Sequence, residues 1–116
     1  MTTRILLLFS TIILLFSCSK PIAPIAPLPD LKNKKVLIVW GGWDGHQPDK
    51  YAQRMEKWLK EEGANVTVSD SLGIYEDSIF MASLDLILPY WTMGTITEKQ
   101  KKGLLTAVKN LSLIHI

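Results

Sequence analysis

Cysteine is almost absent from this 116-residue chain, since Cys18 is the only one. A disulfide within the chain is therefore excluded. An excess of charge of one sign is also lacking. The chain has 13 basic and 11 acidic residues. Without residues 1–17, which have the pattern of an export signal, Arg4 is lost, and 12 basic residues against 11 acidic ones give a formal charge of +1. This balance gives no electrostatic basis for nucleic-acid binding, so we expect no nucleic acid among the partners.

A hydrophobic run long enough for a comfortable transmembrane helix is missing as well. The apolar segment 5–16 is interrupted by Ser10 and Thr11, and it follows Arg4, which is typical of an export signal. It ends in the letters LFSC at residues 15–18, which resemble a bacterial lipobox, where cleavage precedes the cysteine and its thiol carries a lipid. An ordinary secretory peptide with an incidental cysteine is the alternative. We predict a signal peptide at 1–17, lipidation of Cys18, and a lipid-anchored position in a bacterial cell envelope, periplasmic or at the outer membrane.

Proline recurs at nearly every third position between Pro21 and Pro29. Such a segment favours an extended polyproline II conformation and acts as a semi-rigid spacer. We interpret residues 18–33 as the lipidated cysteine and a linker that holds a domain off the membrane. A proline-rich ligand for a partner module is the weaker alternative.

Residues 34–110 carry the pattern of an α/β domain. Continuous apolar and β-branched residues predict a strand buried on both faces of a parallel sheet, and helical spacing predicts a crossover helix after it. A turn region from Asp70 to Met81 can hold a short helical turn. The expected strands are Lys35–Trp40, Asn65–Ser69 and Asp85–Pro89, and the expected helices run from Pro48 to a cap at Gly63 and from Thr97 to about Asn110.

Four details of these elements can be tested directly. Pro89 is expected to end the third strand, and Trp58 to lie in the core on the apolar stripe of the first helix. Thr97 and Gln100 fit a capping box. The last helix is expected to bury Leu104, Leu105 and Val108. The order of elements predicts part of a doubly wound parallel sheet, flavodoxin-like in class.

Two loops with unusual composition follow the first and third strands. They read GGWDGHQP from residue 41 and YWTMGT from residue 90. In open α/β sheets, ligands bind outside the carboxyl ends of the strands, where such loops lead into helices. We therefore expect the two loops to form one site.

The residue types in these loops suit a sugar. Trp43 and Trp91 offer flat apolar faces with an N–H donor at the rim. Asp44 and His46 can exchange protons or ligate a metal, so they are the candidate catalytic residues. The alternatives are that a tryptophan merely caps the sheet and that the Asp-x-His pair is a hydrogen-bonded loop pair. The candidate substrate-binding residues are Trp43, Gly42, Gly45, Trp91 and Thr92. The sequence identifies no metal and no cofactor.

Four segments together resemble the N-terminal part of a ThuA-like (trehalose-utilisation) domain. They read VLIVWGGWDGHQP, LKEEGANVTV, LDLILPYWTMGTIT and QKKGLLTAVKN, and they cover about Lys35 to Asn110. The resemblance implies a fold similar to class I glutamine amidotransferases, often in envelope or secreted proteins, and a role in the metabolism of trehalose, another glycoside or a keto-sugar. The reaction is poorly defined even for that family. The amidotransferase likeness concerns the fold alone, because no thiol nucleophile is present besides Cys18.

The end of the sequence departs from that family, which continues with a glycine-rich strand and a histidine-containing turn. Here the letters LSLIHI occupy residues 111–116, and they are what the end of a transposase-based sequencing adapter encodes. We expect an adapter-derived tail on a truncated domain; a genuine short strand is the alternative. Four functions are compatible with the sequence: a sugar-metabolising enzyme, a non-catalytic carbohydrate-binding lipoprotein, a glutamine amidotransferase, and an inactive truncated product. A glutamine amidotransferase would need a cysteine elsewhere in the parent protein.

Overall fold

The central strand of the structure is β1 (Lys35–Gly42), which pairs in parallel with β2 (Asn65–Ser69) on one side and β3 (Leu86–Thr92) on the other. This computed structural model describes residues 30–111. The predicted signal peptide, Cys18, the proline-rich segment and the tail from 112 onward lie outside the described residues. Within the described range, no helix has the length and apolar character needed to cross a bilayer. The remaining elements are the 3-10 helices η1 (Asp44–His46) and η2 (Leu72–Glu76) and the helices α2 (Pro48–Glu61), α3 (Ser78–Ala82) and α4 (Glu98–Asn110).

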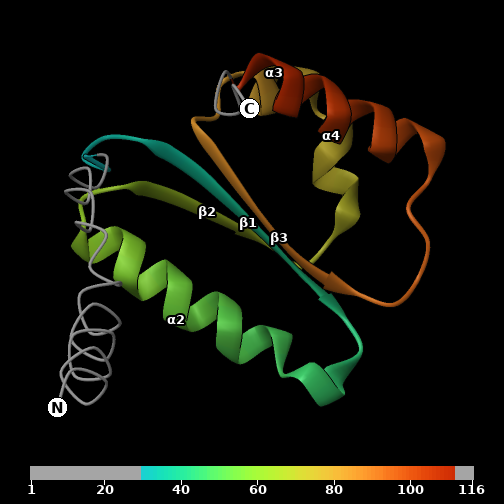
Figure 1. Ribbon diagram of the computed structural model, residues 1–116, viewed down its shortest axis with the longest axis horizontal. Helices are drawn as coiled ribbons and strands as arrows, with labels where there is room; N and C mark the ends of the chain where they lie inside the picture. The colour runs from blue at the N-terminus through green and yellow to red at the C-terminus, as the bar shows by residue number, and fades with distance from the viewer. Residues whose placement is uncertain (1–29, 112–116) are drawn as a thin grey trace, which may run out of the picture.

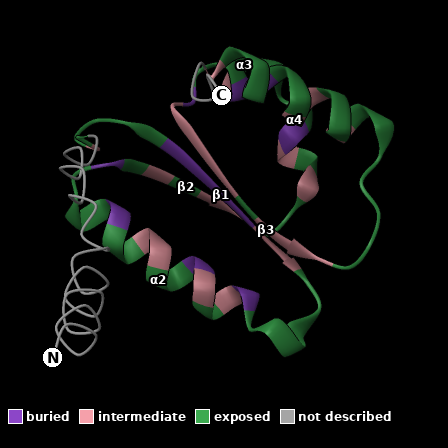
Figure 2. Cartoon of the chain, in the orientation of Figure 1, coloured by how far each residue is buried: buried purple, intermediate pink, exposed green. Residues whose placement is uncertain are grey.

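Helices cover both faces of the sheet, with α2 on one side and α3 and α4 on the other (Figure 1). Side chains of successive strand residues point to opposite faces. Val36 and Ile38 accordingly pack in the cluster that includes α2, and Leu37 and Val39 pack in the cluster that includes α4. All four are 0% exposed, and β1 is the buried centre of the molecule in Figure 2. The prediction of a strand buried on both faces is confirmed.

The helix α2 connects the parallel strands β1 and β2, which confirms the expected βαβ crossover. Ala52 and Leu59 are buried against the sheet, and Gly63 follows the helix with φ +86°, a left-handed conformation that glycine adopts without strain. The prediction for Trp58 is wrong, since 44% of this residue is exposed. Leu59, the next residue along α2, is the one that is fully buried against the sheet, whereas the neighbouring indole of Trp58 is partly exposed.

The opposite layer contains η2, α3 and α4. Before the third strand the sequence predicts a loop from Asp70 to Met81 that can hold a short helical turn, and the structure has η2 and α3 there. The helix α4 lies against η2 at Gly103, where an added Cβ would be 1.9 Å from the carbonyl oxygen of Tyr75. This contact directs Ala107, 3% exposed, toward the core. Leu104 packs against the same cluster as predicted, but Leu105 and Val108 are 50% and 45% exposed, so their predicted burial is wrong.

The strand β3 does not end at Pro89 but continues to Thr92. Proline lacks a backbone N–H, which an edge strand tolerates because one side of its ladder is open. Since β3 lies at the edge of the sheet, the expected end at Pro89 is corrected to Thr92. The predicted capping box of α4 is confirmed, with the Gln100 N–H donating to Thr97 Oγ1 at 3.2 Å and the Thr97 N–H donating to Gln100 Oε1 at 3.1 Å.

The described part is thus an α/β fold with a three-stranded parallel sheet between two helical layers. This arrangement is compatible with a flavodoxin-like fold. The carboxyl ends of β1 and β3 lie side by side, which fixes the position of the loops that follow them.

Candidate functional site

The two loops singled out in the sequence adjoin each other. Gly41 pairs with Trp91 and Gly42 with Thr92 in the ladder between β1 and β3. The N–H of Trp43 then donates to the carbonyl oxygen of Thr92 at 2.9 Å, which carries the pairing one residue past the end of β1. The parallel sheet therefore brings both loops to one edge, as expected.

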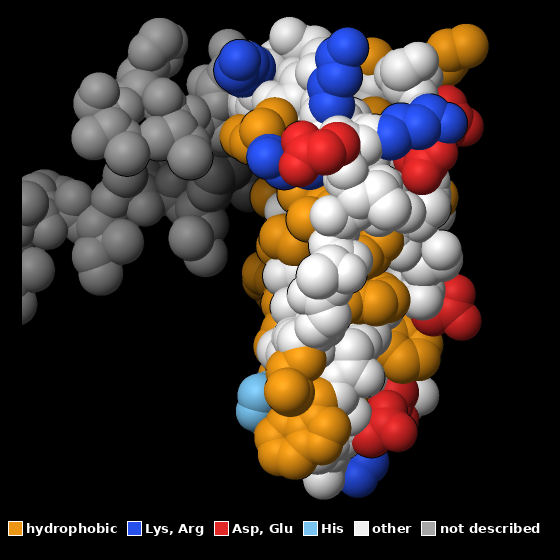
Figure 3. All heavy atoms as spheres, turned by 90° about the vertical axis from the view of Figure 1, so that its right-hand side faces the viewer, with side chains coloured by type: hydrophobic (Ala, Val, Ile, Leu, Met, Phe, Trp, Pro, Cys, Tyr) orange, Lys and Arg blue, Asp and Glu red, His pale blue; other side chains and the backbone are white. Residues whose placement is uncertain are grey.

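Trp43 is the exposed large hydrophobic residue of this loop, at 54% exposure. Its ring meets the imidazole of His46 edge to face, with ring centroids 4.8 Å apart and an interplanar angle of 71°. The 3-10 helix η1 creates this contact, because the His46 N–H donates to the Trp43 carbonyl at 3.2 Å. Figure 3 shows a histidine beside a group of hydrophobic side chains at this end of the molecule. One indole is thus held outward with an imidazole at its side.

Gly45 is required by the position of this indole. A Cβ added at Gly45 would lie 2.5 Å from the Trp43 ring, far inside van der Waals contact. Gly42 is required for a different reason: its φ is +91°, and a Cβ there would lie 1.7 Å from the carbonyl oxygen of Thr92. Both glycines permit close packing within the site.

Thr92 carries a buried hydroxyl oxygen, Oγ1, that has no hydrogen-bond partner in the described residues. An unsatisfied buried polar atom lowers stability by about 1–3 kcal/mol, and functional sites are one place where this is tolerated. Among the described residues, Thr92 is therefore a predicted site residue with a buried hydroxyl that makes no hydrogen bond.

Trp91 differs from Trp43 in its surroundings. Its six-membered ring covers Gly41, where an added Cβ would be 2.5 Å away, and it packs against the cluster that contains Leu37 and Val39. Trp91 and Trp43 form no aromatic pair with each other in the described residues. The two indoles thus do not form one continuous platform, and packing accounts for the position of Trp91.

Asp44 and His46 are both exposed. The Asp44 carboxylate takes part in none of the ion pairs or side-chain hydrogen bonds found between residues 30 and 111, so it is free to accept a proton or a hydroxyl donor from a ligand. No group of three or more potential metal-ligating side chains occurs in that range. The chemistry that the described residues can supply is hydrogen bonding and proton exchange beside an aromatic surface.

Two tyrosines of this region escaped the sequence interpretation. The rings of Tyr51 on α2 and Tyr90 on β3 stack at a centroid distance of 3.9 Å and an angle of 16°. The Tyr90 hydroxyl donates to the His46 carbonyl oxygen at 3.4 Å. The signal was available in the alternation of β3, because Leu88 and Tyr90 share the face that α2 covers. The expected end of the strand at Pro89 concealed it.

No known family, no curated protein and no solved structure matches this chain in comparisons of sequence and fold.

Proposed function

We propose that the chain belongs to a lipid-anchored, ThuA-like protein of sugar metabolism, and that the loop after β1 contacts the sugar. The finer fold proposed is that of the class I glutamine amidotransferases, which agrees with the order β2-β1-β3 of a parallel sheet. The sequence motifs VLIVWGGWDGHQP and LDLILPYWTMGTIT lie on β1, β3 and the loops that follow them.

One observation carries this proposal: the outward indole of Trp43 beside His46. Sugar rings expose a C–H face that packs on a flat aromatic surface, while their hydroxyls need nearby donors and acceptors. Trp43 supplies the surface, and Asp44 and His46 lie within three residues of it. The Thr92 hydroxyl, which is buried and has no partner among the described residues, lies at the end of β3.

In an enzyme, His46 would act as the proton-transfer group and Asp44 as its acidic partner or as an additional hydrogen-bond acceptor. Gly42 and Gly45 would allow the backbone to approach the sugar closely. Trp91 covers Gly41, where an added Cβ would lie 2.5 Å from its ring, and contact of Trp91 with the sugar stays a prediction.

Turnover tests this proposal. The full chain is incubated with a panel of disaccharides and keto-sugars, with and without added divalent cations, and products are separated by chromatography. We expect product from at least one sugar, reduced at least tenfold in His46→Ala. Because His46 is exposed, the free energy of unfolding should change by less than about 1 kcal/mol. A loss of about 2–5 kcal/mol, as in a core truncation, would make His46 a structural residue.

A non-catalytic carbohydrate-binding lipoprotein is the second candidate. The exposure of Trp43, Asp44 and His46 favours it, because a catalytic site commonly encloses its reacting groups. Saturable binding of a sugar without product in the same assay would select this function over the enzyme.

The envelope location is a separate part of the proposal. Labelling of cells with an alkyne fatty acid should mark the wild-type chain and leave the Cys18→Ala variant unlabelled. Equal labelling of the two chains would contradict the lipid anchor at Cys18 but would not bear on the proposed sugar site.

A further inference from the structure

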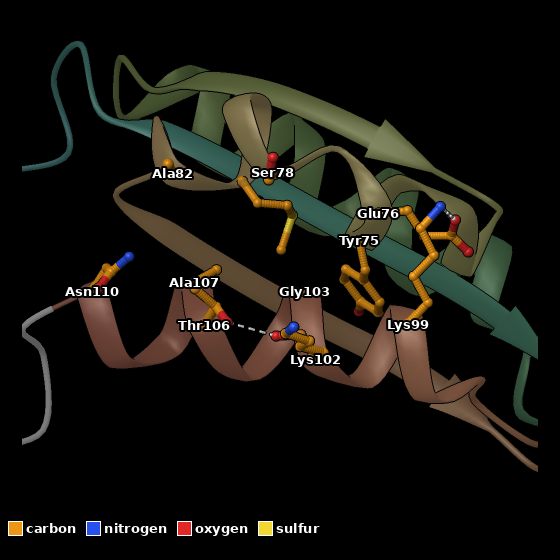
Figure 4. Close-up of a pocket in the computed structure, with 11 residues that line it drawn as sticks. Tyr75, Glu76, Ser78, Ala82, Lys99, Lys102, Gly103, Thr106, Ala107 and Asn110 are labelled. Carbon is orange, nitrogen blue, oxygen red and sulfur yellow. Dashed lines mark hydrogen bonds and ion pairs between the residues drawn. The ribbon is translucent and has the colours of Figure 1, made fainter.

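A groove of about 290 Å³ lies between α4 and the layer formed by η2 and α3. Figure 4 shows its lining side chains, with Tyr75 extending from η2 toward α4. Met81 is also one of the lining residues. None of the lining residues belongs to the loops at the carboxyl ends of β1 and β3. The groove is therefore separate from the proposed sugar site.

Tyr75 places an unused hydrogen-bond donor in this groove. The residue is 1% exposed, and its hydroxyl has no hydrogen-bond partner among the described residues. Burial also raises the pKa of Tyr75 to about 12, so the hydroxyl keeps its proton at neutral pH. A buried donor without an acceptor lowers stability unless something supplies the acceptor.

The position of this tyrosine is fixed by close backbone packing. Its carbonyl oxygen lies against Gly103 of α4, where an added Cβ would be only 1.9 Å away. Consequently, the backbone of η2 that carries this tyrosine is held closely against α4.

Positive charge lines the same groove. Lys99 forms an ion pair with the Glu76 carboxylate at 2.6 Å, and this hydrogen bond lowers the pKa of Glu76, so the two charges compensate each other. Lys102, which also lines the groove, takes part in none of the ion pairs found between residues 30 and 111. The groove thus combines apolar walls, one buried donor and one uncompensated ammonium group.

We propose that this groove binds a small organic monocarboxylate with an apolar body. The carboxylate accepts the Tyr75 hydroxyl proton in a hydrogen bond and faces Lys102, while the apolar body lies against Met81 and Ala107. Because the Tyr75 hydroxyl is shielded from solvent, binding requires side chains that line the groove to shift. A charge-assisted hydrogen bond in an apolar surrounding is the strong kind, which gives carboxylates their advantage over alcohols.

The test uses hexanoate, 1-hexanol and hexylamine as probes of the same chain length. Each is titrated into the full chain, and the amide NMR shifts of Tyr75, Gly103 and Thr106 are followed. We expect saturable shifts with hexanoate, at least tenfold weaker binding of 1-hexanol, and no binding of hexylamine. Tyr75→Phe removes only an unpaired hydroxyl, so this variant should fold, and it should bind hexanoate about tenfold more weakly.

A matched pair of lysine variants distinguishes a direct effect of the Lys102 charge in the groove from an effect of the overall charge of α4. Lys102→Gln should weaken hexanoate binding about threefold, whereas Lys109→Gln, on the same helix but outside the groove, should leave it unchanged. Absence of saturable shifts with hexanoate would overturn the proposal, as would equal affinity for 1-hexanol or an unchanged affinity in Tyr75→Phe. The NMR probes lie on α4 and η2, away from the loop that contains Trp43. A negative result with hexanoate would therefore not bear on the proposed sugar site.

Discussion

The imidazole of His46 lies edge to face against the indole of Trp43, at a centroid distance of 4.8 Å. Gly45, between them in the chain, has no room for a side chain because the Trp43 ring occupies that space. The loop after β1 thus acts as one packed unit in which an aromatic surface and a proton-exchanging group have a fixed relationship. Edge-to-face aromatic contacts contribute about 0.5–1.5 kcal/mol beyond their buried area.

The first prediction concerns Gly45→Ala. The added methyl group would lie 2.5 Å from the Trp43 ring and would displace it from His46. We expect sugar affinity to fall at least fivefold while the free energy of unfolding changes by less than about 1 kcal/mol, because the loop is exposed. Gly73→Ala is the control, since its nearest neighbour would be the flexible Ser71 hydroxyl at 3.2 Å. Unchanged sugar affinity in Gly45→Ala would contradict the packed-loop interpretation.

Gly103→Ala provides a test of the α4 layer. Alanine is favoured over glycine inside a helix by about 1 kcal/mol, so propensity alone predicts stabilisation. The structure predicts the opposite, because the methyl group would overlap the Tyr75 carbonyl oxygen and push α4 away from η2. Overpacking of this kind costs about 1–3 kcal/mol, measurable by urea unfolding. Lys109→Ala on the exposed side should be nearly neutral, and a Gly103→Ala variant as stable as wild type would show that α4 is placed differently.

Much of the fold could be predicted from the sequence because its signals are local. The β-branched run in β1, the left-handed Gly63 and the Thr97–Gln100 box each depend on neighbours within a few residues. The errors arise where a distant partner decides. Burial along α4 is set by the contact of Gly103 with η2, which no pattern within α4 reveals.

The site could be predicted in position but not in the roles of its residues. The rule for carboxyl ends of parallel strands placed both loops at one edge, and the ladder pairs Gly42 with Thr92 there. The difference between Trp43 and Trp91 depends on the pleat, since Trp91 shares the α4 face with Ile87 and packs into the core. The same pleat brings Tyr90 onto Tyr51, a pairing hidden by the expected stop at Pro89.

Acid dependence of stability should report on Asp85, which joins the starts of β1 and β3. The Lys35 N–H donates to its carboxylate at 2.8 Å, and Lys34 Nζ lies 3.2 Å away, and these contacts lower the pKa of Asp85. A lowered pKa gives stability that is present above the ordinary aspartate value of 3.8 and is lost as the pH falls below it. Asp85→Asn should therefore flatten the stability profile below about pH 4. Asp70→Asn is the control variant and should leave the stability profile unchanged. If it flattens the profile as much as Asp85→Asn does, the contacts of Asp85 with Lys34 and Lys35 are not the cause of the acid dependence.

Alkaline dependence should report on Tyr75, since burial raises its pKa to about 12. A raised pKa gives stability that is complete below the unfolded value near 10 and is lost as the pH rises toward about 12. Wild type should thus lose stability relative to Tyr75→Phe, by on the order of 1 kcal/mol at pH 11. Urea unfolding of both chains at pH 8, 10 and 11 measures this difference. Parallel profiles would mean that Tyr75 is solvated.

The most direct measurement for the sugar site is a titration of the full chain with trehalose and the other disaccharides, followed by tryptophan fluorescence. Trp43→Ala is compared with Trp58→Ala, because Trp58 is also exposed, at 44%, but lies on α2 outside the loop. The proposed site predicts a saturable change in wild type and in Trp58→Ala, with binding lost in Trp43→Ala. Equal binding by all three chains, or no saturable change with any sugar in wild type, would contradict it.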